Sequence, residues 1–153
     1  MKQVYRFMIM ALAATLLTAC SGGDSEEARL ERTLTLMNDE LDPATDGIWQ
    51  HSGWELTEEG EVSLFPKTDE EWAAMAEAAD EVIAVTRKLQ SEEYSGGDEE
   101  WIAIAESVIV FAGEAKEAAI AQDEDGVFES GGDIYRACRA CHQRYAPGMR
   151  QDG

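Results

Sequence analysis

Apolar residues recur at three- and four-residue intervals in four segments of the chain, the spacing that lines up one face of an α-helix. The first segment covers residues 26–41 and places on one face Leu30, Leu34, Met37 and Leu41. Asp42-Pro43 interrupts this pattern. Because proline suits the first turn of a helix, Asp42 is expected to cap a short helical continuation to Trp49.

The other three segments have recognisable helix starts and stops. Residues 68–71, Thr-Asp-Glu-Glu, have the form of a capping box, which predicts a helix that runs to about residue 90. Asp98, followed by two glutamates, predicts the start of a helix that ends near Gln122. Residues 123–126 predict a turn, after which a fourth helix continues until Pro147.

Four helices joined by mostly short connections favour an antiparallel up-and-down four-helix bundle, so the predicted fold class is all-α. The longest connection, residues 50–67, contains glycines and a weak apolar alternation, and we expect a loop that can hold a small hairpin. The helical domain is expected to cover residues 26–150, the size of one domain. Large side chains on the apolar stripes are interpreted as core packing, among them Trp72, Trp101 and Phe111.

The first residues have the features of an export signal. Two basic residues precede an apolar run over residues 7–19, which is shorter than the roughly 20 residues of a membrane-spanning helix. Residues 17–20, Leu-Thr-Ala-Cys, resemble the lipobox of bacterial lipoproteins. The resemblance implies a signal peptide over residues 1–19, a lipidated Cys20 and a flexible tether over residues 20–25. A serine after the cysteine further implies the periplasm, at the outer membrane rather than the inner one.

The chain is strongly acidic, with 32 Asp and Glu against 12 Lys and Arg and a net charge of −20. Removal of residues 1–19 takes away two basic residues and no acidic ones, which brings the net charge to −22. Such a surface repels the phosphates of nucleic acids and favours encounters with basic protein partners. Nucleic-acid binding is therefore excluded, and the charge also keeps the domain soluble.

Residues 138–142, Cys-Arg-Ala-Cys-His, match the attachment sequence for c-type haem. On a helix, positions three and four apart share a face, so both thiols and the imidazole project to the same side. The thiols can add to the two vinyl groups of the porphyrin while the imidazole reaches the iron. The motif predicts one covalent haem c, held by Cys138 and Cys141, with His142 as an axial ligand of the iron.

Other uses of two neighbouring cysteines fit the sequence less well. Structural zinc needs four ligands, and after Cys20 the chain has no second cysteine pair and one further histidine, His51. A thioredoxin-like pair would begin a helix inside an α/β pattern, which the sequence does not indicate.

Because the motif lies on the last predicted helix, the chain resembles the class II cytochromes c, the cytochrome c prime family, over roughly residues 26–147. The specific part of the resemblance is residues 135–145, Tyr-Arg-Ala-Cys-Arg-Ala-Cys-His-Gln-Arg-Tyr, and the rest matches by helix layout. The resemblance implies a four-helix bundle that carries the haem near its C-terminus. Gly131-Gly132 would weaken this helix, which indicates either a close approach by haem or another helix, or a kink or a helix start at Asp133.

Three arginines, Arg136, Arg139 and Arg144, surround the motif, and Arg150 follows them. Guanidinium groups can neutralise haem propionates through paired hydrogen bonds. We therefore treat these arginines as candidate propionate contacts, although arginine is also common on a solvent-facing helix.

The resemblance leaves the opposite side of the iron open, because some members have a methionine from the first helix there and others leave the position empty. Met37 lies on the apolar face of the first helix and is the candidate distal ligand, although methionine also serves as packing material. Met75 is interpreted as core, and Met149 follows His142 too closely to reach over the haem. His51, in a loop, is the weaker candidate.

Three functions follow from these predictions. Ligation by His142 and Met37 predicts a membrane-anchored periplasmic electron carrier with a basic redox partner. A five-coordinate iron instead predicts a haem protein that binds nitric oxide or carbon monoxide. The third is an acidic helical adaptor lipoprotein in which the two cysteines form a disulfide. No catalytic constellation can be assigned, so an enzyme is not expected, and homodimer formation stays open.

Overall fold

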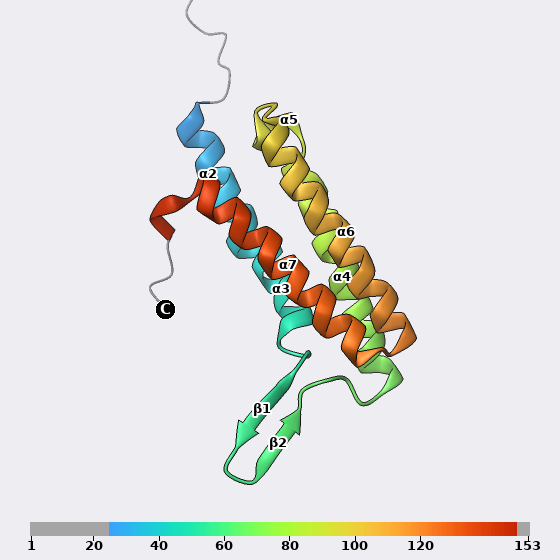
Figure 1. Ribbon diagram of the computed structural model, residues 1–153. Coiled ribbons are helices and arrows are strands. Elements are labelled where there is room, and N and C mark those ends of the chain that lie inside the picture. Colours follow the sequence, from blue (N-terminus) through green and yellow to red (C-terminus); the bar gives the residue numbers. More distant parts are fainter. Residues whose placement is uncertain (1–24, 150–153) are drawn as a thin grey trace, which may run out of the picture.

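The structure is a computed structural model that describes residues 25–149 (Figure 1). The predicted signal peptide, Cys20 and most of the predicted tether lie outside the described residues, as does Arg150. Most of the described part is helical, and a two-stranded sheet is the main exception. The all-α prediction is confirmed at this coarse level. No helix of residues 25–149 is both long enough and apolar enough to cross a membrane.

The first helical segment is continuous rather than interrupted. Helix α2 (Glu26–Leu36) passes through one π-helical turn, η1 (Met37–Leu41), into helix α3 (Asp42–Trp49). Pro43 lacks an N–H and its ring would clash with the carbonyl four residues earlier, and a wider turn relieves this. In that turn the Asp42 N–H donates to the carbonyl of Met37, five residues back.

The predicted capping role of Asp42 is therefore wrong, because this residue has helical backbone angles and makes no side-chain cap. The carbonyls around the proline find another donor instead. The Thr45 hydroxyl lies 3.1 Å from the Leu41 oxygen and 2.9 Å from the Asp42 oxygen, and it can donate to either. A buried threonine thus supports the widened turn.

Residues 50–67 contain a short antiparallel hairpin of strands β1 (Trp54–Thr57) and β2 (Gly60–Ser63). The hairpin projects from the end of the helices that lies opposite the short helix α5 (Glu92–Ser95) (Figure 1). The Trp54 ring joins it to the last helix, because its centre lies 5.5 Å from that of Phe128, and it also lies 5.1 Å from Phe65 in the loop that follows the hairpin.

The remaining helices start close to the positions that the sequence predicts. Helix α4 (Asp69–Leu89) begins with the predicted capping box, and helix α6 (Glu99–Ala121) begins at the cap Asp98. Between them the short helix α5 (Glu92–Ser95) was not predicted. Helix α7 (Glu124–Tyr145) begins directly after the cap Asp123, so the expected turn over residues 123–126 is shorter than predicted. A 3-10 turn, η2 (Pro147–Met149), follows.

The helices pack in a defined order. Helix α4 packs along α6, α6 packs along α7, and α3 packs against both α4 and α7. The side chains most completely buried between them include Ile48, Val82, Ala112 and Ile134. Helix α2 differs, because it packs against α5, and two leucines of its predicted apolar stripe stay exposed, Leu30 at 55% and Leu34 at 38%.

Candidate functional site

A cleft of about 900 Å³ lies between the first helical segment and the C-terminal half of α7. Its size falls within the range of roughly 300 to 1,000 Å³ that is usual for ligand and cofactor sites. One wall comes from α2, η1 and α3 and includes Leu30, Leu34 and Met37; the other comes from α7 and includes Cys138, Cys141 and His142.

The exposed leucines of α2 are explained by this cleft. Leu30 and Leu34 lie on the apolar face that the sequence predicts, but they line the open cleft instead of the core. Leu36, two residues further, is 3% exposed and belongs to the core. The helix therefore divides its apolar residues between the core and a space that no described residue fills.

Two tryptophan–tyrosine pairs mark the ends of the cleft. At one end the Trp49 ring lies 6.3 Å from Tyr135 in an edge-to-face arrangement, and at the other Trp101 lies 5.0 Å from Tyr145. Tyr135 and Tyr145 are ten residues apart on α7, which is about 15 Å along an α-helix. The three motif side chains lie between them.

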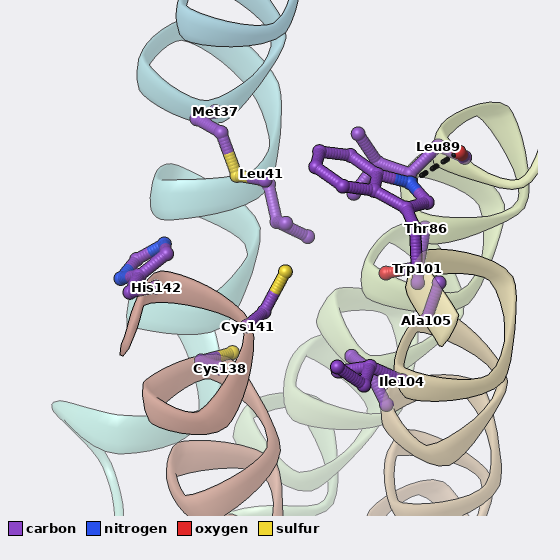
Figure 2. Close-up of a pocket in the computed structure, with 11 residues that line it drawn as sticks. Met37, Leu41, Thr86, Leu89, Trp101, Ile104, Ala105, Cys138, Cys141 and His142 are labelled. Atoms are coloured by element: carbon purple, nitrogen blue, oxygen red, sulfur yellow. Dashed lines mark hydrogen bonds between the residues drawn. The ribbon is translucent and has the colours of Figure 1, made fainter. Parts of the chain in front are cut away.

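The cleft continues inward as a small cavity of about 30 Å³ (Figure 2). The two spaces share six lining residues, Met37, Leu41, Trp101, Cys138, Cys141 and His142. The inner cavity adds residues of α4 and α6, such as Thr86, Leu89 and Ile104. Almost all of its lining is apolar.

The two thiols are half-buried and face this inner region. Burial raises the pKa of Cys138 to about 11, and the neighbouring Cys141 adds to the effect. Burial alone raises the pKa of Cys141 to about 11. Both groups are therefore neutral thiols at physiological pH, which makes them weak nucleophiles without assistance.

Figure 2 shows Met37 on η1 and His142 on α7, the two elements that form the facing walls. Met37 is partly buried, whereas His142 is exposed. Met75 is buried in the core on α4, as predicted, and the exposed His51 lines neither cavity. Among the side chains that the structure describes, Met37 is the methionine that lines the cleft.

The three candidate arginines differ in their surroundings. Arg136 pairs with Asp133 on the same helix, and the Arg144 Nε lies 3.1 Å from the Glu100 Oε2. Arg144 also lies over the Tyr145 ring, 5.3 Å from its centre. Arg139 lines the cleft and makes no ion pair with another residue of the range 25–149.

Arg139 is thus the basic side chain in the lining of the cleft that can bind an anion. The carboxylate that lines the same cleft is Asp42 of α3. Because Arg136 and Arg144 already have carboxylate partners, the arrangement separates the three arginines that the sequence treats alike.

Tyr145 closes the cleft next to the cap of α6. Burial raises the pKa of its hydroxyl to about 12, and the nearby carboxylates of Asp98 and Glu100 add to the effect. The Asp98 carboxyl caps α6, and the backbone N–H of Trp101 lowers its pKa. The closing tyrosine is therefore a neutral phenol beside an ionised carboxylate.

Gly131, one of the two glycines before the motif, contacts a neighbouring helix. The Trp49 Nε1 donates to the Gly131 carbonyl at 3.1 Å, and a Cβ on Gly131 would lie 3.6 Å from the same indole. Another helix therefore packs against Gly131, in agreement with one of the expected alternatives, although at 3.6 Å an added Cβ would make an ordinary van der Waals contact. A helix start at Asp133 is wrong, because α7 begins at Glu124 and runs through both glycines.

Several lining residues could not be identified from the sequence. Trp101, interpreted as core packing, lines both spaces, and its Nε1 donates to the Leu89 carbonyl at 2.8 Å. Thr86 lines the inner cavity and Tyr135 lines the cleft, although the sequence indicated only that Thr86 lies on a helix stripe and that Tyr135 precedes the motif. No group of three or more His, Cys, Asp or Glu side chains in residues 25–149 is arranged to hold a metal ion.

Comparisons with protein-family models, with curated proteins and with solved structures found no match to this chain. The motif and the cleft are therefore the features that indicate a function.

Two leucines of α2 test whether the cleft is separate from the core. Leu34→Ala should change the free energy of unfolding of the cofactor-free protein by less than about 1 kcal/mol, because Leu34 contacts little of the core. Leu36→Ala should cost roughly 2 to 5 kcal/mol, because it leaves a cavity in the core. Urea unfolding measures both, and equal losses would show that Leu34 is a core residue.

Proposed function

We propose that this chain is a monohaem c-type cytochrome that transfers electrons. One observation carries the proposal: residues 138–142 place two thiols and an imidazole on one wall of a cleft of about 900 Å³, and Met37 lies on the opposite wall. A four-residue separation on a helix accounts for the shared face of Cys138 and His142.

The chemistry of the cleft fits a porphyrin. Its walls are largely apolar and aromatic. Two leucines of α2, Leu30 and Leu34, line it and stay exposed. A porphyrin is a flat, mainly apolar group with two carboxylates, so it needs apolar walls and a cation at one edge. The cleft offers both, the cation being Arg139.

The fold that we propose is the antiparallel four-helix bundle of the cytochrome c prime family. Its helices would be α2 to α3 counted as one, then α4, α6 and α7. The packing of α4 on α6, α6 on α7, and α3 on α4 and α7 supports this assignment. The position of the motif on α7, the last long helix, supports it as well.

Haem, once bound, would supply an iron that is oxidised and reduced by one electron. Cys138 and Cys141 would hold it by adding their S–H groups across the two vinyl groups, so that each thiol proton moves to a vinyl carbon. His142 would bind the iron from the α7 side, and Met37 would bind it from η1. A sulfur ligand opposite the imidazole raises the reduction potential.

We further propose that Cys20 carries lipid and that the domain acts in the periplasm, held to the outer membrane. This part rests on the sequence of residues 1–25. The net charge of −22 without the signal peptide favours a redox partner with a basic surface, because opposite charges steer such encounters.

A second candidate function is the binding of nitric oxide or carbon monoxide. The inner cavity favours it, because this cavity leaves a space of about 30 Å³ beside Met37 that no described side chain fills. In this function Met37 would line the pocket or give way to the gas.

Covalent haem attachment tests the main proposal. The full chain, produced in a bacterium that attaches c-type haem, should keep haem absorbance and one added haem mass after denaturation. The double variant Cys138→Ser with Cys141→Ser should lose both signals, whereas Cys20→Ser should keep them. A wild-type chain without covalent haem would instead support the adaptor with a Cys138–Cys141 disulfide.

Substitution of Met37 separates the two haem functions. In the electron carrier, Met37→Ala should convert a low-spin iron to a high-spin one, abolish the sulfur-to-iron absorption band and lower the reduction potential, because the sulfur ligand is lost. Met75→Leu, a change in the core, should leave the spectrum unaltered. A wild-type protein that is already high-spin and binds carbon monoxide readily would favour gas binding.

The three arginines should contribute unequally to the reduction potential. Arg139→Gln should lower it by a few tens of millivolts, the order expected from Coulomb's law when one partly screened positive charge is lost. Arg136→Gln and Arg144→Gln should change it less, because each of these cations already has a carboxylate partner. Redox titration of the three variants measures the difference, and equal shifts would contradict the special position of Arg139.

A further inference from the structure

Thr86 is an exception among the serine and threonine hydroxyl groups on the helices of residues 25–149. Five others donate to the carbonyl four residues earlier on their own helix, namely those of Thr33, Thr35, Thr45, Ser107 and Ser130. The Thr86 hydroxyl, on α4, makes no hydrogen bond with any residue in the described range, although the residue is only 1% exposed. Leaving a buried hydroxyl unpaired costs about 1 to 3 kcal/mol.

The unpaired hydroxyl faces the inner cavity. Thr86 lines this cavity, and Figure 2 shows its oxygen turned toward the space that Cys141 and Leu41 also border. The cavity, at about 30 Å³, exceeds the roughly 10 to 15 Å³ that one water-sized molecule needs. There is therefore room beside this donor for a molecule of two or three atoms.

The packing of the helices places Thr86 on the Met37 side of the proposed haem. Helix α4 packs against η1, α3 and α6, whereas α7, which carries His142, packs against α6 and α3. In the proposed bundle α4 is thus the neighbour of the helix with Met37. A ligand that replaced Met37 would lie on the side of the iron from which Thr86 approaches.

Water alone does not satisfy this site. A buried water usually makes two to four hydrogen bonds, and most of the other groups around the cavity are apolar. The Trp101 Nε1, another N–H group of the lining, is already bonded to the Leu89 carbonyl at 2.8 Å. A small molecule held there needs a second attachment, and the haem iron would provide one.

We propose that the Thr86 hydroxyl is the hydrogen-bond donor to a diatomic gas bound on the Met37 side of the iron. The proposal rests on the proposed haem and deepens the gas-binding function by naming the polar group of the pocket. Thr86 touches the ligand rather than the iron. The apolar remainder of the cavity keeps competing water out.

Carbon monoxide bound to the reduced Met37→Ala protein is the test, because its stretching frequency falls when a donor bonds to its oxygen. Adding Thr86→Val, which keeps the shape and removes the hydroxyl, should shift the infrared band to higher frequency. It should also raise the dissociation constant of carbon monoxide about fivefold, the factor that one ordinary hydrogen bond contributes. Adding Thr86→Ser instead should keep both values near those of Met37→Ala.

A matched control is Ser130→Ala, which removes a hydroxyl that is also buried but lies outside both cavities and bonds to the Gly126 carbonyl. It should leave the infrared band in place. An identical band in the valine and serine variants of Thr86, or no uptake of carbon monoxide by Met37→Ala, would overturn the proposal. Absence of covalent haem from the wild-type chain would be a different result, which removes the proposed function itself.

Discussion

The contact between Trp49 and Gly131 determines where the first helical segment meets the last one. The indole N–H bonds to the glycine carbonyl at 3.1 Å and brings α3 against α7 at one end of the cleft. Toward the other end, α2 is held on a different neighbour, because Arg32 donates to the Glu93 carbonyl of α5 at 3.1 Å and pairs with its carboxylate at 3.2 Å. Because the first helical segment is held by α7 at one end and by α5 at the other, a cleft is left between this segment and α7.

The cleft must present an apolar surface to a cofactor, and the cofactor-free protein must nevertheless stay soluble. Exposed leucines lower solubility, yet here they are placed on a highly acidic chain, whose charge opposes association. The two half-buried thiols are neutral and therefore react slowly with electrophiles and oxidants. They nevertheless lie next to the space in which a porphyrin would bind. In the cofactor-free protein the two thiols are thus unreactive but accessible to a haem that enters the cleft.

Local features could be predicted from the sequence, and features that depend on packing could not. The capping box at Thr68 and the cap at Asp98 were predicted because each involves residues within one turn. The shared helical face of Cys138 and His142 follows from their spacing in the same way.

The apolar stripe of α2 shows where such reasoning ends. Periodicity identified the face of Leu30 and Leu34, but it could not indicate that this face borders a cleft instead of the core, because that depends on how α2 is held by α5. Periodicity likewise identifies Trp101 as part of an apolar stripe, but no neighbouring residue indicates that Trp101 or Thr86 lines a cavity. Their importance comes from four helices meeting at one level, which no single segment of the sequence encodes.

The π-helical turn at η1 also determines the two faces of the first helical segment. One extra residue in a helix rotates everything beyond it by about 100° relative to a regular helix. The first helical segment therefore directs Ala44 and Ile48 into the core while the leucines of α2 line the cleft. If all five residues between Met37 and Leu41 adopted regular α-helical geometry, α3 would be turned out of register with α2, whereas a regular turn with one residue fewer would keep both faces. The width of this turn, rather than the length of the segment, therefore determines which residues of α2 and α3 face the site.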